Sequence, residues 1–438
     1  MNISKYKMMG LWFMGALLLC QVQGNDALYK LLDSRASEVE EKVIAWRRDF
    51  HENPELSNRE FRTAKIVAAH LQSLGLEVQT GVAHTGVVGL LKGGKPGPVV
   101  ALRADMDALP VTENTSLSFA SKVRSEYNGQ KVGVMHACGH DAHTAILMGV
   151  AQVLAGMKDR VPGTVKFIFQ PAEEGAPKGE EGGAELMVRE GVMKNPEVEA
   201  VFGLHISSQS PLNSLSYRPG GLMASSDRLS IVVKGKQAHG ASPWSGVDPV
   251  VVSAQIIMAL QTIPSRQVNA TLAPSVISIG SIHGGVRSNI IPAEVEMIGT
   301  IRSLNPAMRI DIHERIHRTA THIAESAGAQ AIVEIDMGYN VTVNDPNLTS
   351  QMQATMERVA GSKNVLNIPP ITGSEDFSFL AGEAPGLFFF LGATPADISI
   401  TEASGHHTPE FFVDESSFLL GVRTLLHLTV DYMSSAGQ

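Results

Sequence analysis

The sequence has little cysteine, no excess of positive charge and no internal repeat. Its 438 residues include only two cysteines, Cys20 and Cys138, which excludes a disulfide scaffold. The formal net charge of −9 argues against nucleic acid and against an anionic membrane surface as partners. Hydrophobic residues make up 44% and charged residues 18%, which is typical of a globular protein, and the length allows two domains.

Long hydrophobic runs are also missing, except for one at the N-terminus. Two lysines precede an apolar run from Met8 to Cys20, and the small residue Gly24 follows. This run is short for a membrane span, so we favour a signal peptide over residues 1–24 and rank a retained anchor lower. We therefore expect an exported protein, in the periplasm, the medium or an organelle lumen. Its mature form would not bind a membrane, and Cys138 would have no cysteine partner.

Periodicity divides the remaining chain into an α/β domain and an inserted middle unit. Residues 37–221 alternate helical patterns with continuous apolar strands such as Val99–Leu102 and Val165–Phe169, which indicates a mixed or parallel sheet covered on both faces. Residues 223–338 follow the order βαββαβ of a ferredoxin-like unit. Residues 344–436 return to the α/β pattern. The predicted fold class is α/β, with a mixed-sheet domain interrupted by a ferredoxin-like dimerisation (lid) unit.

A dense cluster of coordinating side chains lies between Met135 and His143. Three histidines, a cysteine and an aspartate occur here, just before a helix rich in alanine and leucine. Thiolate and imidazole are preferred ligands of zinc and similar ions, so we favour a metal site over hydrogen-bonded structural histidines. A nucleophilic Cys138 activated by histidine is the alternative. We rank it lower because other segments supply further ligands.

Acidic residues follow two of the apolar strands. Asp105 and Asp107 come after the first and can orient a metal ligand or a catalytic group, although a turn with solvated aspartates fits the same pattern. Glu173 and Glu174 follow the second. One carboxylate of such a pair can bind metal while the other holds a water molecule and moves its proton. Ligands and catalysts gather at such strand ends in α/β sheets.

Two further histidines extend the ligand set. His205 follows the apolar strand Ala200–Leu204, and His407 precedes Thr408-Pro409. Either can be structural, and the adjacent His406 is an alternative to His407. The segment Thr394–Ser404 has no assigned role. Five side chains make a set able to hold two divalent ions: Cys138, His140, Glu174, His205 and His407.

These motifs resemble the aminoacylase/carboxypeptidase family of dinuclear metallohydrolases. The closest branch is the amidohydrolases that include hippurate hydrolase, indole-acetyl-amino-acid hydrolase and acetyl-diaminopimelate deacetylase. The likeness runs from about Trp46 to the final helix. It rests on Met135–His143, Pro171–Gly175, Gly203–His205, Gly235–Ala241, Gly373–Phe377 and His407–Pro409. The carboxypeptidase branch has His-x-Asp where this chain has Asp105-Met106-Asp107, a departure shared with the amidohydrolase branch.

The resemblance implies roles for individual residues. The five ligands would hold two divalent ions, zinc or manganese first, with nickel or cobalt also compatible. Glu173 would be the general base, and Asp107 is counted with the catalytic residues. His239 would reach the active site of a neighbouring subunit and stabilise the oxyanion. Substrate binding would fall to Asn289, Ser374 and Glu375.

The implied activity is hydrolysis of the amide bond of an N-acyl amino acid to a carboxylate and a free amino acid. The enzyme would be a homodimer formed through the middle unit. A metallo-dipeptidase or aminopeptidase on the same scaffold is the enzymatic alternative. A non-catalytic exported binding protein is the alternative from another class, and the presence of Glu173 beside a full ligand set counts against it.

Overall fold

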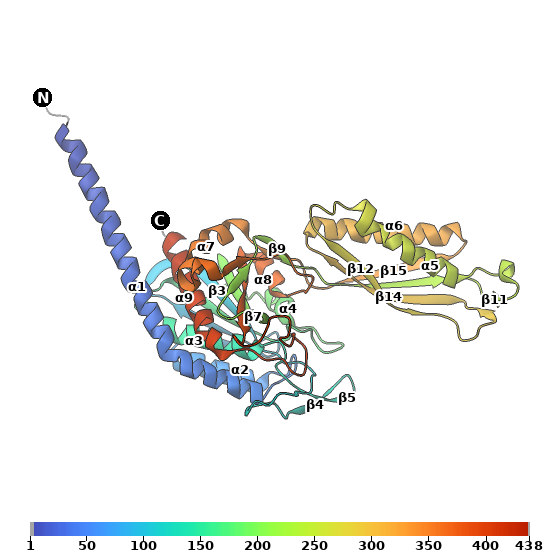
Figure 1. Ribbon diagram of the computed structural model, residues 1–438, viewed down its shortest axis with the longest axis horizontal. Coiled ribbons are helices and arrows are strands. Elements are labelled where there is room, and N and C mark those ends of the chain that lie inside the picture. The colour runs from blue at the N-terminus through green and yellow to red at the C-terminus, as the bar shows by residue number, and fades with distance from the viewer. Residues whose placement is uncertain (1–3, 437–438) are drawn as a thin grey trace. The chain divides into compact units, whose positions relative to one another are not determined.

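The computed structural model describes the backbone of residues 4–436 and the side chains of residues 26–435. The chain forms two compact units (Figure 1). The first unit comprises the described residues up to Tyr217, together with Ser350–Leu366 and those from Phe388 on. The second unit comprises Arg218–Thr349 and Asn367–Leu387.

An eight-stranded mixed sheet forms the centre of the first unit, which confirms the predicted fold class. Strand β3 lies parallel to both β6 and β7, whereas β2 runs antiparallel to β6 and to β1. In sheet order the strands are β1 Glu77–Val82, β2 Gly86–Lys92, β6 Pro162–Gln170, β3 Lys95–Asp105, β7 Ala200–Pro211, β18 Gly386–Thr394, β8 Leu215–Tyr217 and β17 Val365–Asn367. A separate hairpin joins β4 Arg124–Tyr127 to β5 Gln130–Gly133.

Helix α3, His140–Ala155, is the most deeply buried helix of this unit. Fourteen of its 16 residues are buried, and it contacts the sheet strands β3 and β7 and the helices α1 and α9. The other helices of this part are α1 Ser4–Glu52, α2 Phe61–Ser73, α4 Gly183–Arg189, α7 Pro346–Ala360 and α9 Phe418–Ala436. Phe61, the first residue of α2, has a side chain that is 64% exposed.

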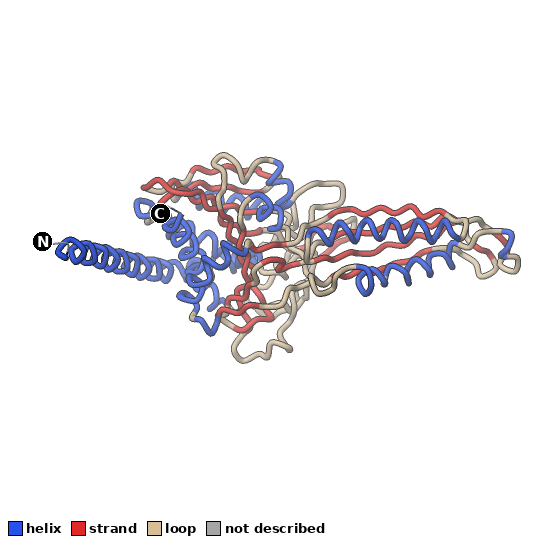
Figure 2. The backbone as a smooth tube through the Cα atoms, turned by 90° about the horizontal axis from the view of Figure 1, so that it is seen from above, coloured by secondary structure: helices blue, strands red, loops and turns tan. Residues whose placement is uncertain are grey.

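The second unit contains the predicted βαββαβ order. Its strands form one antiparallel sheet in the order β12-β14-β10-β15, and α5 and α6 cover the same face of it (Figures 1 and 2). Both helices begin at a side-chain cap followed by proline: Asp248 caps α5, and Asn305 caps α6. The elements are β10 Asp227–Lys234, α5 Pro249–Leu260, β12 Ser275–His283, β14 Glu294–Ser303, α6 Pro306–Ser326 and β15 Gln330–Met337.

Residues 367–387 pack with the second unit, although the sequence analysis placed them in the last part of the α/β domain. Backbone pairing explains this difference. Met223 forms a bridge with Ile371, and the Ala224 amide donates to the Gly373 carbonyl at 2.8 Å. The short elements here are β9 Gly220–Met223, β16 Thr342–Asn344 and α8 Phe377–Glu383, and a separate small pair joins β11 Ala238–His239 to β13 Ile290–Ile291.

The segment predicted as a signal peptide, residues 1–24, falls largely outside the description. From Ser4 its backbone belongs to α1, but its side chains lie beyond the described residues. Export therefore stays a prediction. Across the described helices, none combines the length and the apolar character needed to cross a membrane.

Candidate active site

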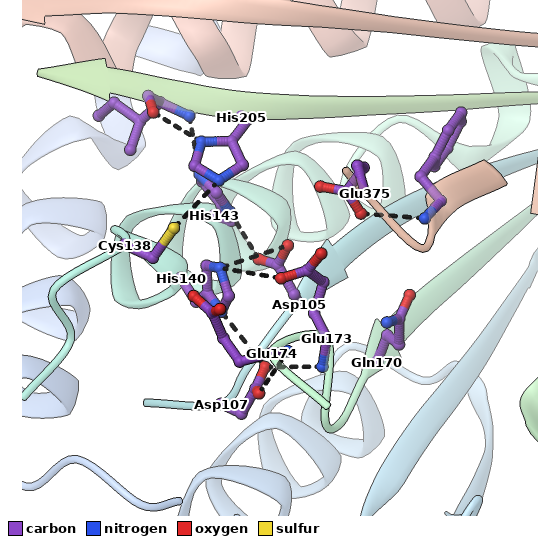
Figure 3. Close-up of polar contacts among 12 residues, drawn as sticks. Asp105, Asp107, Cys138, His140, His143, Gln170, Glu173, Glu174, His205 and Glu375 are labelled. Atoms are coloured by element: carbon purple, nitrogen blue, oxygen red, sulfur yellow. Dashed lines mark hydrogen bonds and ion pairs between the residues drawn. The ribbon is translucent and has the colours of Figure 1, made fainter. Parts of the chain in front are cut away.

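Parallel strand pairing brings the acidic segments and His205 together. β3 ends at Asp105, β6 ends at Gln170 just before the turn that carries Glu173 and Glu174, and β7 carries His205. Because β3 pairs in parallel with both other strands, the three segments meet on one side of the first unit's sheet (Figure 3). The turn before α3 supplies Cys138, and the first residue of α3 is His140.

A glycine lets two ligands approach from one tight turn. Gly139 has a φ of +94°, and a Cβ atom on it would lie 2.4 Å from the Ile206 Cγ2 atom. Only glycine meets both conditions without strain. Cys138 stands before this turn and His140 opens α3 directly after it, so both side chains enter the same buried space.

The structure gathers all five predicted ligands into overlapping groups. One donor atom each from Cys138, His140 and His205 lie within 4.8 Å of one another, and the same holds for Cys138, Glu174 and His407. The Cys138 Sγ atom lies 3.4 Å from His205 Nε2, and His407 Nε2 lies 3.0 Å from Glu174 Oε1. Cys138 is therefore common to two ligand groups, an arrangement that suits two neighbouring ions.

The electrostatics of this cluster favour bound cations. Burial, together with the charges of Glu174 and Glu173, raises the pKa of the Cys138 thiol well above its usual range. Burial lowers the pKa of His140, but Asp105 and Asp107 outweigh it and raise this pKa to about 10. The buried Nε2 atom of His140 has no hydrogen-bond partner among the described residues. Divalent ions would offset the repulsion among the carboxylates, and one of them would be a partner for the His140 Nε2 atom. The residues therefore fit a metal centre.

Hydrogen bonds from the outer ring nitrogens orient the histidine rings. His205 Nδ1 donates to the Ile206 carbonyl at 2.7 Å, which leaves Nε2 facing Cys138. His140 Nδ1 lies 3.2 Å from Asp107 Oδ1, which leaves Nε2 facing the cluster. Such outer contacts fix the tautomer of a ligating imidazole. Burial and the neighbouring histidines lower the pKa of His205 well below its usual range, so its ring is neutral, as ligation requires.

His143 has both ring nitrogens engaged elsewhere. Its Nε2 accepts from the Ile206 amide at 2.7 Å, so its Nδ1 carries the proton and donates to Asp105 Oδ1 at 2.5 Å. Asp105 also accepts from Arg103 Nη1 at 2.7 Å. His143 and Asp105 thus form a buried support behind the ligands.

Asp107 contacts both a ligand and the turn that carries the acidic pair. Its Oδ1 accepts from the Glu173 amide at 3.1 Å, and its Oδ2 accepts from the Glu174 amide at 3.0 Å. Ser57 Oγ donates to Oδ2 as well, at 2.7 Å. With the contact to His140, these bonds allow one fully buried carboxylate to fix two parts of the site.

His406 and His407 make different contacts. His406 Nε2 accepts from the Ser208 amide at 3.4 Å, so the proton lies on Nδ1, which faces Cys138 Sγ at 3.6 Å. Both ring nitrogens of His406 therefore have partners within the protein. His407 instead points its Nε2 at Glu174, from a backbone with a φ of +64°. The geometry favours His407 as the ligand.

The segment 394–404 has a visible role in placing these two histidines. Thr394 Oγ1 donates to the Ser208 carbonyl at 2.8 Å, and Ser208 Oγ donates to the Ser404 carbonyl at 2.8 Å. Gln209 Nε2 donates to the Ala403 carbonyl at 3.2 Å. Both ends of the segment are thereby tied to the end of β7, beyond His205.

The second unit carries the remaining predicted site residues. His239 is exposed, and its Nδ1 accepts from the Ala241 amide at 3.0 Å, so its Nε2 carries a proton that it can donate. The backbone carbonyl of Asn289 accepts from the Gly240 amide at 2.8 Å, so Asn289 lies beside the residue that follows His239. Glu375 is buried and accepts from the Phe377 amide at 2.9 Å, while Ser374 is half-buried. Their roles stay predictions.

Two buried carboxylates of the first unit make contacts that the sequence analysis did not predict. Asp141, counted there among the coordinating side chains, pairs instead with two residues of α1, Arg47 Nε at 3.0 Å and His51 Nδ1 at 2.7 Å. Glu60, just before α2, accepts from the Ala172 amide at 3.0 Å. Neither contact has a local sequence signal, because each joins segments far apart in the chain.

A buried cluster of thiol, imidazole and carboxylate donors, at strand ends of a mixed sheet, is typical of metal-dependent hydrolases. The sequence model of peptidase family M20/M25/M40 matches residues 101–431, and the chain belongs to this family. The predicted family and the assignment as a hydrolase of amide bonds are both confirmed.

Relatives match over nearly their whole length. Thermostable carboxypeptidase 2 of Saccharolobus solfataricus is 42% identical over 400 residues, which cover 90% of this chain and 96% of that protein. N-acetyl-L-cysteine deacetylase of Bacillus subtilis is 34% identical over 402 residues, which cover 91% of each. The solved structure of the Bacillus subtilis YXEP protein, a dinuclear metal-binding peptidase of family M20, has a TM-score of 0.76 at 33% identity and covers 91% of this chain and 99% of that chain.

Proposed function

We propose that this protein is an amidohydrolase that cleaves N-acyl amino acids to a carboxylate and a free amino acid. The observation that carries the proposal is the sharing of Cys138 between two ligand groups, with Glu173 beside them. Two divalent ions per chain, zinc or manganese, would be held by the five gathered side chains. Thiolate and imidazole suit zinc, and carboxylate suits manganese, so availability would decide between them.

The proposed reaction relies on proton transfer by Glu173. Bound divalent ions would polarise the scissile carbonyl and lower the pKa of a water molecule. Glu173 is buried, and its Oε2 lies 3.9 Å from His140 Nε2, which places its carboxylate beside the ligands. From there its carboxylate accepts the proton of the attacking water and returns it to the leaving amine. Asp107 holds the Glu173 amide and so fixes where this carboxylate stands.

A peptidase acting on free peptides is the second candidate function. The observation in its favour is the 42% identity to a protein named as a carboxypeptidase. The N-acyl assignment is supported by the relative named as a deacetylase and by Asp105 at the position where the carboxypeptidase branch has histidine. In this chain Asp105 is ion-paired with Arg103 and hydrogen-bonded to His143, and so serves as support.

A homodimer formed through the second unit is part of the proposal. Strand β12 is an edge strand of nine residues, and it exposes Val276 and Ile282. Helix α5 exposes Val251 and Met258 on the same unit. Long edges with exposed apolar side chains favour pairing with another chain. In such a dimer His239, with its exposed Nε2 proton, would stabilise the oxyanion in the partner's site.

The proposed role of Glu173 is tested by Glu173→Gln. We expect this variant to bind metal as the wild type does, because the ligands stay in place, and to lose roughly 100- to 10,000-fold in turnover, because the amide cannot accept a proton. Metal content by mass spectrometry and turnover on N-acetyl amino acids are the measurements. Glu174→Gln is the matched control, and it should lose metal. Turnover near wild type in Glu173→Gln would remove Glu173 as the base.

A further inference from the structure

Three consecutive amides in the turn that carries Glu173 donate to buried carboxylates. The Glu173 and Glu174 amides donate to the two oxygens of Asp107. The preceding amide, that of Ala172, donates to Glu60 Oε1 at 3.0 Å. The backbone amides of all three residues, Ala172 to Glu174, are therefore bonded to protein carboxylates and not to water. The side chains of Glu60 and Asp107 together fix the backbone of this turn.

The turn needs this support because its backbone is strained. Ala172 has a φ of +52°, in the left-handed region that residues with a Cβ atom rarely adopt. Such a conformation persists only where its surroundings over-determine it. The Glu60 contact holds the amide of this strained residue, directly before the proposed base.

Glu60 is itself firmly held. It is fully buried just before α2, and its Oε1 also accepts from the Asn58 amide at 3.0 Å. Its Oε2 accepts from Thr85 Oγ1 at 2.5 Å. Asn58 Nδ2 in turn donates to the Glu181 carbonyl at 3.0 Å. The loop before α2 therefore holds the turn through the Glu60 carboxylate, whose hydrogen bonds go to Asn58, Thr85 and Ala172 and to none of the five proposed ligands.

We propose that Glu60 is a positioning residue for the reaction: by holding the Ala172 amide, it fixes the turn that aims Glu173 at the substrate. This inference rests on the proposed function, in which Glu173 moves the proton. A displacement of about 1 Å at a catalytic group can lower a rate by roughly 100-fold. Glu60 acts through position, so its charge is not required. Burial, with the nearby charge of Asp107, raises the pKa of Glu60 to about 8, which fits a group that works as an acceptor in either protonation state.

Two substitutions separate position from charge. Glu60→Gln keeps the reach and the accepting oxygen but cannot ionise, and it should keep kcat within about threefold of wild type. Glu60→Asp keeps an ionisable carboxyl group but is one methylene too short for the Ala172 amide. It should lower kcat by roughly 10- to 100-fold, with KM and metal content unchanged. Glu60→Ala should behave like Glu60→Asp.

Glu55→Ala is the matched control. Glu55 lies in the same loop and accepts from the amides of Arg62 and Thr63 at 2.9 and 2.8 Å, but it makes no side-chain contact with the turn. This variant should lower the melting temperature and leave kcat unchanged. kcat, KM, metal content and melting temperature are measured for all four variants.

The proposal is overturned by any of three results. The first is wild-type kcat in Glu60→Asp. The second is loss of metal together with the fall in kcat of Glu60→Asp. The third is the same fall in kcat in Glu55→Ala. Should Glu60→Ala not fold, the comparison of Glu60→Gln with Glu60→Asp decides alone. Turnover near wild type in Glu173→Gln would instead contradict the proposed function. The Glu60 and Glu55 variants do not test that function, so the two failures can be told apart.

Discussion

Asp227, at the start of β10, shows how single buried charges are held in the second unit. Both of its carboxylate oxygens lie 3.1 Å from Arg309 Nε, and His313 Nε2 donates to Oδ2 at 2.8 Å. Arg309 also donates to Asn340 Oδ1 at 2.7 Å. Burial raises the pKa of Asp227, but the hydrogen bonds from His313 and Arg309 outweigh it, so this pKa lies below its usual range.

Asp227→Asn should destabilise the protein at neutral pH. It leaves the buried Arg309 without a counterion, at a cost of about 3 kcal/mol or more in the free energy of unfolding. Because the folded pKa lies below the unfolded value of about 4, the contribution of Asp227 is present above that pH and is lost as pH falls through the folded pKa. Urea unfolding at pH 7 and at low pH should therefore show a gap between the two proteins that narrows in acid.

The control for Asp227 is Asp336→Asn. Asp336 lies on β15 with a side chain 73% exposed, and it pairs with Arg228 only at 3.6 Å. Exposed pairs of this kind contribute little, so its removal should leave the unfolding curve unchanged. Equal stability of Asp227→Asn and the wild type at pH 7 would show that the buried pair does not stabilise the fold.

Residue types explain which site residues could be predicted. Cys138, His140 and His205 were found because thiol and imidazole stand out beside strands and turns, whatever the fold. Glu60 was missed because a glutamate before a helix is an ordinary surface residue in most proteins. Only tertiary contact shows that it is buried and holds the Ala172 amide. Supporting residues lack a chemical signature, whereas ligands have one.

At the scale of elements, apolar periodicity was sufficient for the second unit. Strand β10 has one buried face, on which Leu229, Ile231 and Val233 alternate with more exposed residues. The predicted strand Val99–Leu102 is only the apolar middle of β3, which extends over Lys95–Asp105 because Arg103 and Asp105 continue the pairing with β6. Periodicity finds the centre of an element better than its ends.

Short paired elements could not be predicted from periodicity. β8 and β17 have three residues each, too few for a pattern, yet both belong to the large sheet. The bridge between Met223 and Ile371 likewise has no local signal, although it ties residues 367–387 to the second unit. Pairing between distant segments is set by tertiary structure, and a single sequence does not display it.

At the scale of the whole molecule, the proposed dimer predicts that two inactive variants restore each other. His239→Ala should lose roughly 100- to 1,000-fold in turnover and keep its metal, because it removes one oxyanion donor. In a mixture with Glu173→Gln, half of the dimers would be mixed and would contain one intact site. Activity should then recover to about a quarter of wild type on random exchange of subunits. Activity after subunit exchange is the measurement, and no recovery would argue against a shared site.

The central claim is that five side chains, brought from distant parts of the chain, hold two ions that hydrolysis of N-acyl amino acids requires. The most direct test is a titration of metal-free enzyme with zinc or manganese, while hydrolysis of N-acetyl amino acids and of dipeptides is followed. We predict no turnover without metal, a rise that levels off at about two ions per chain, and preference for the N-acetyl substrates. Turnover without metal, saturation at one ion, or cleavage of dipeptides alone would contradict the account.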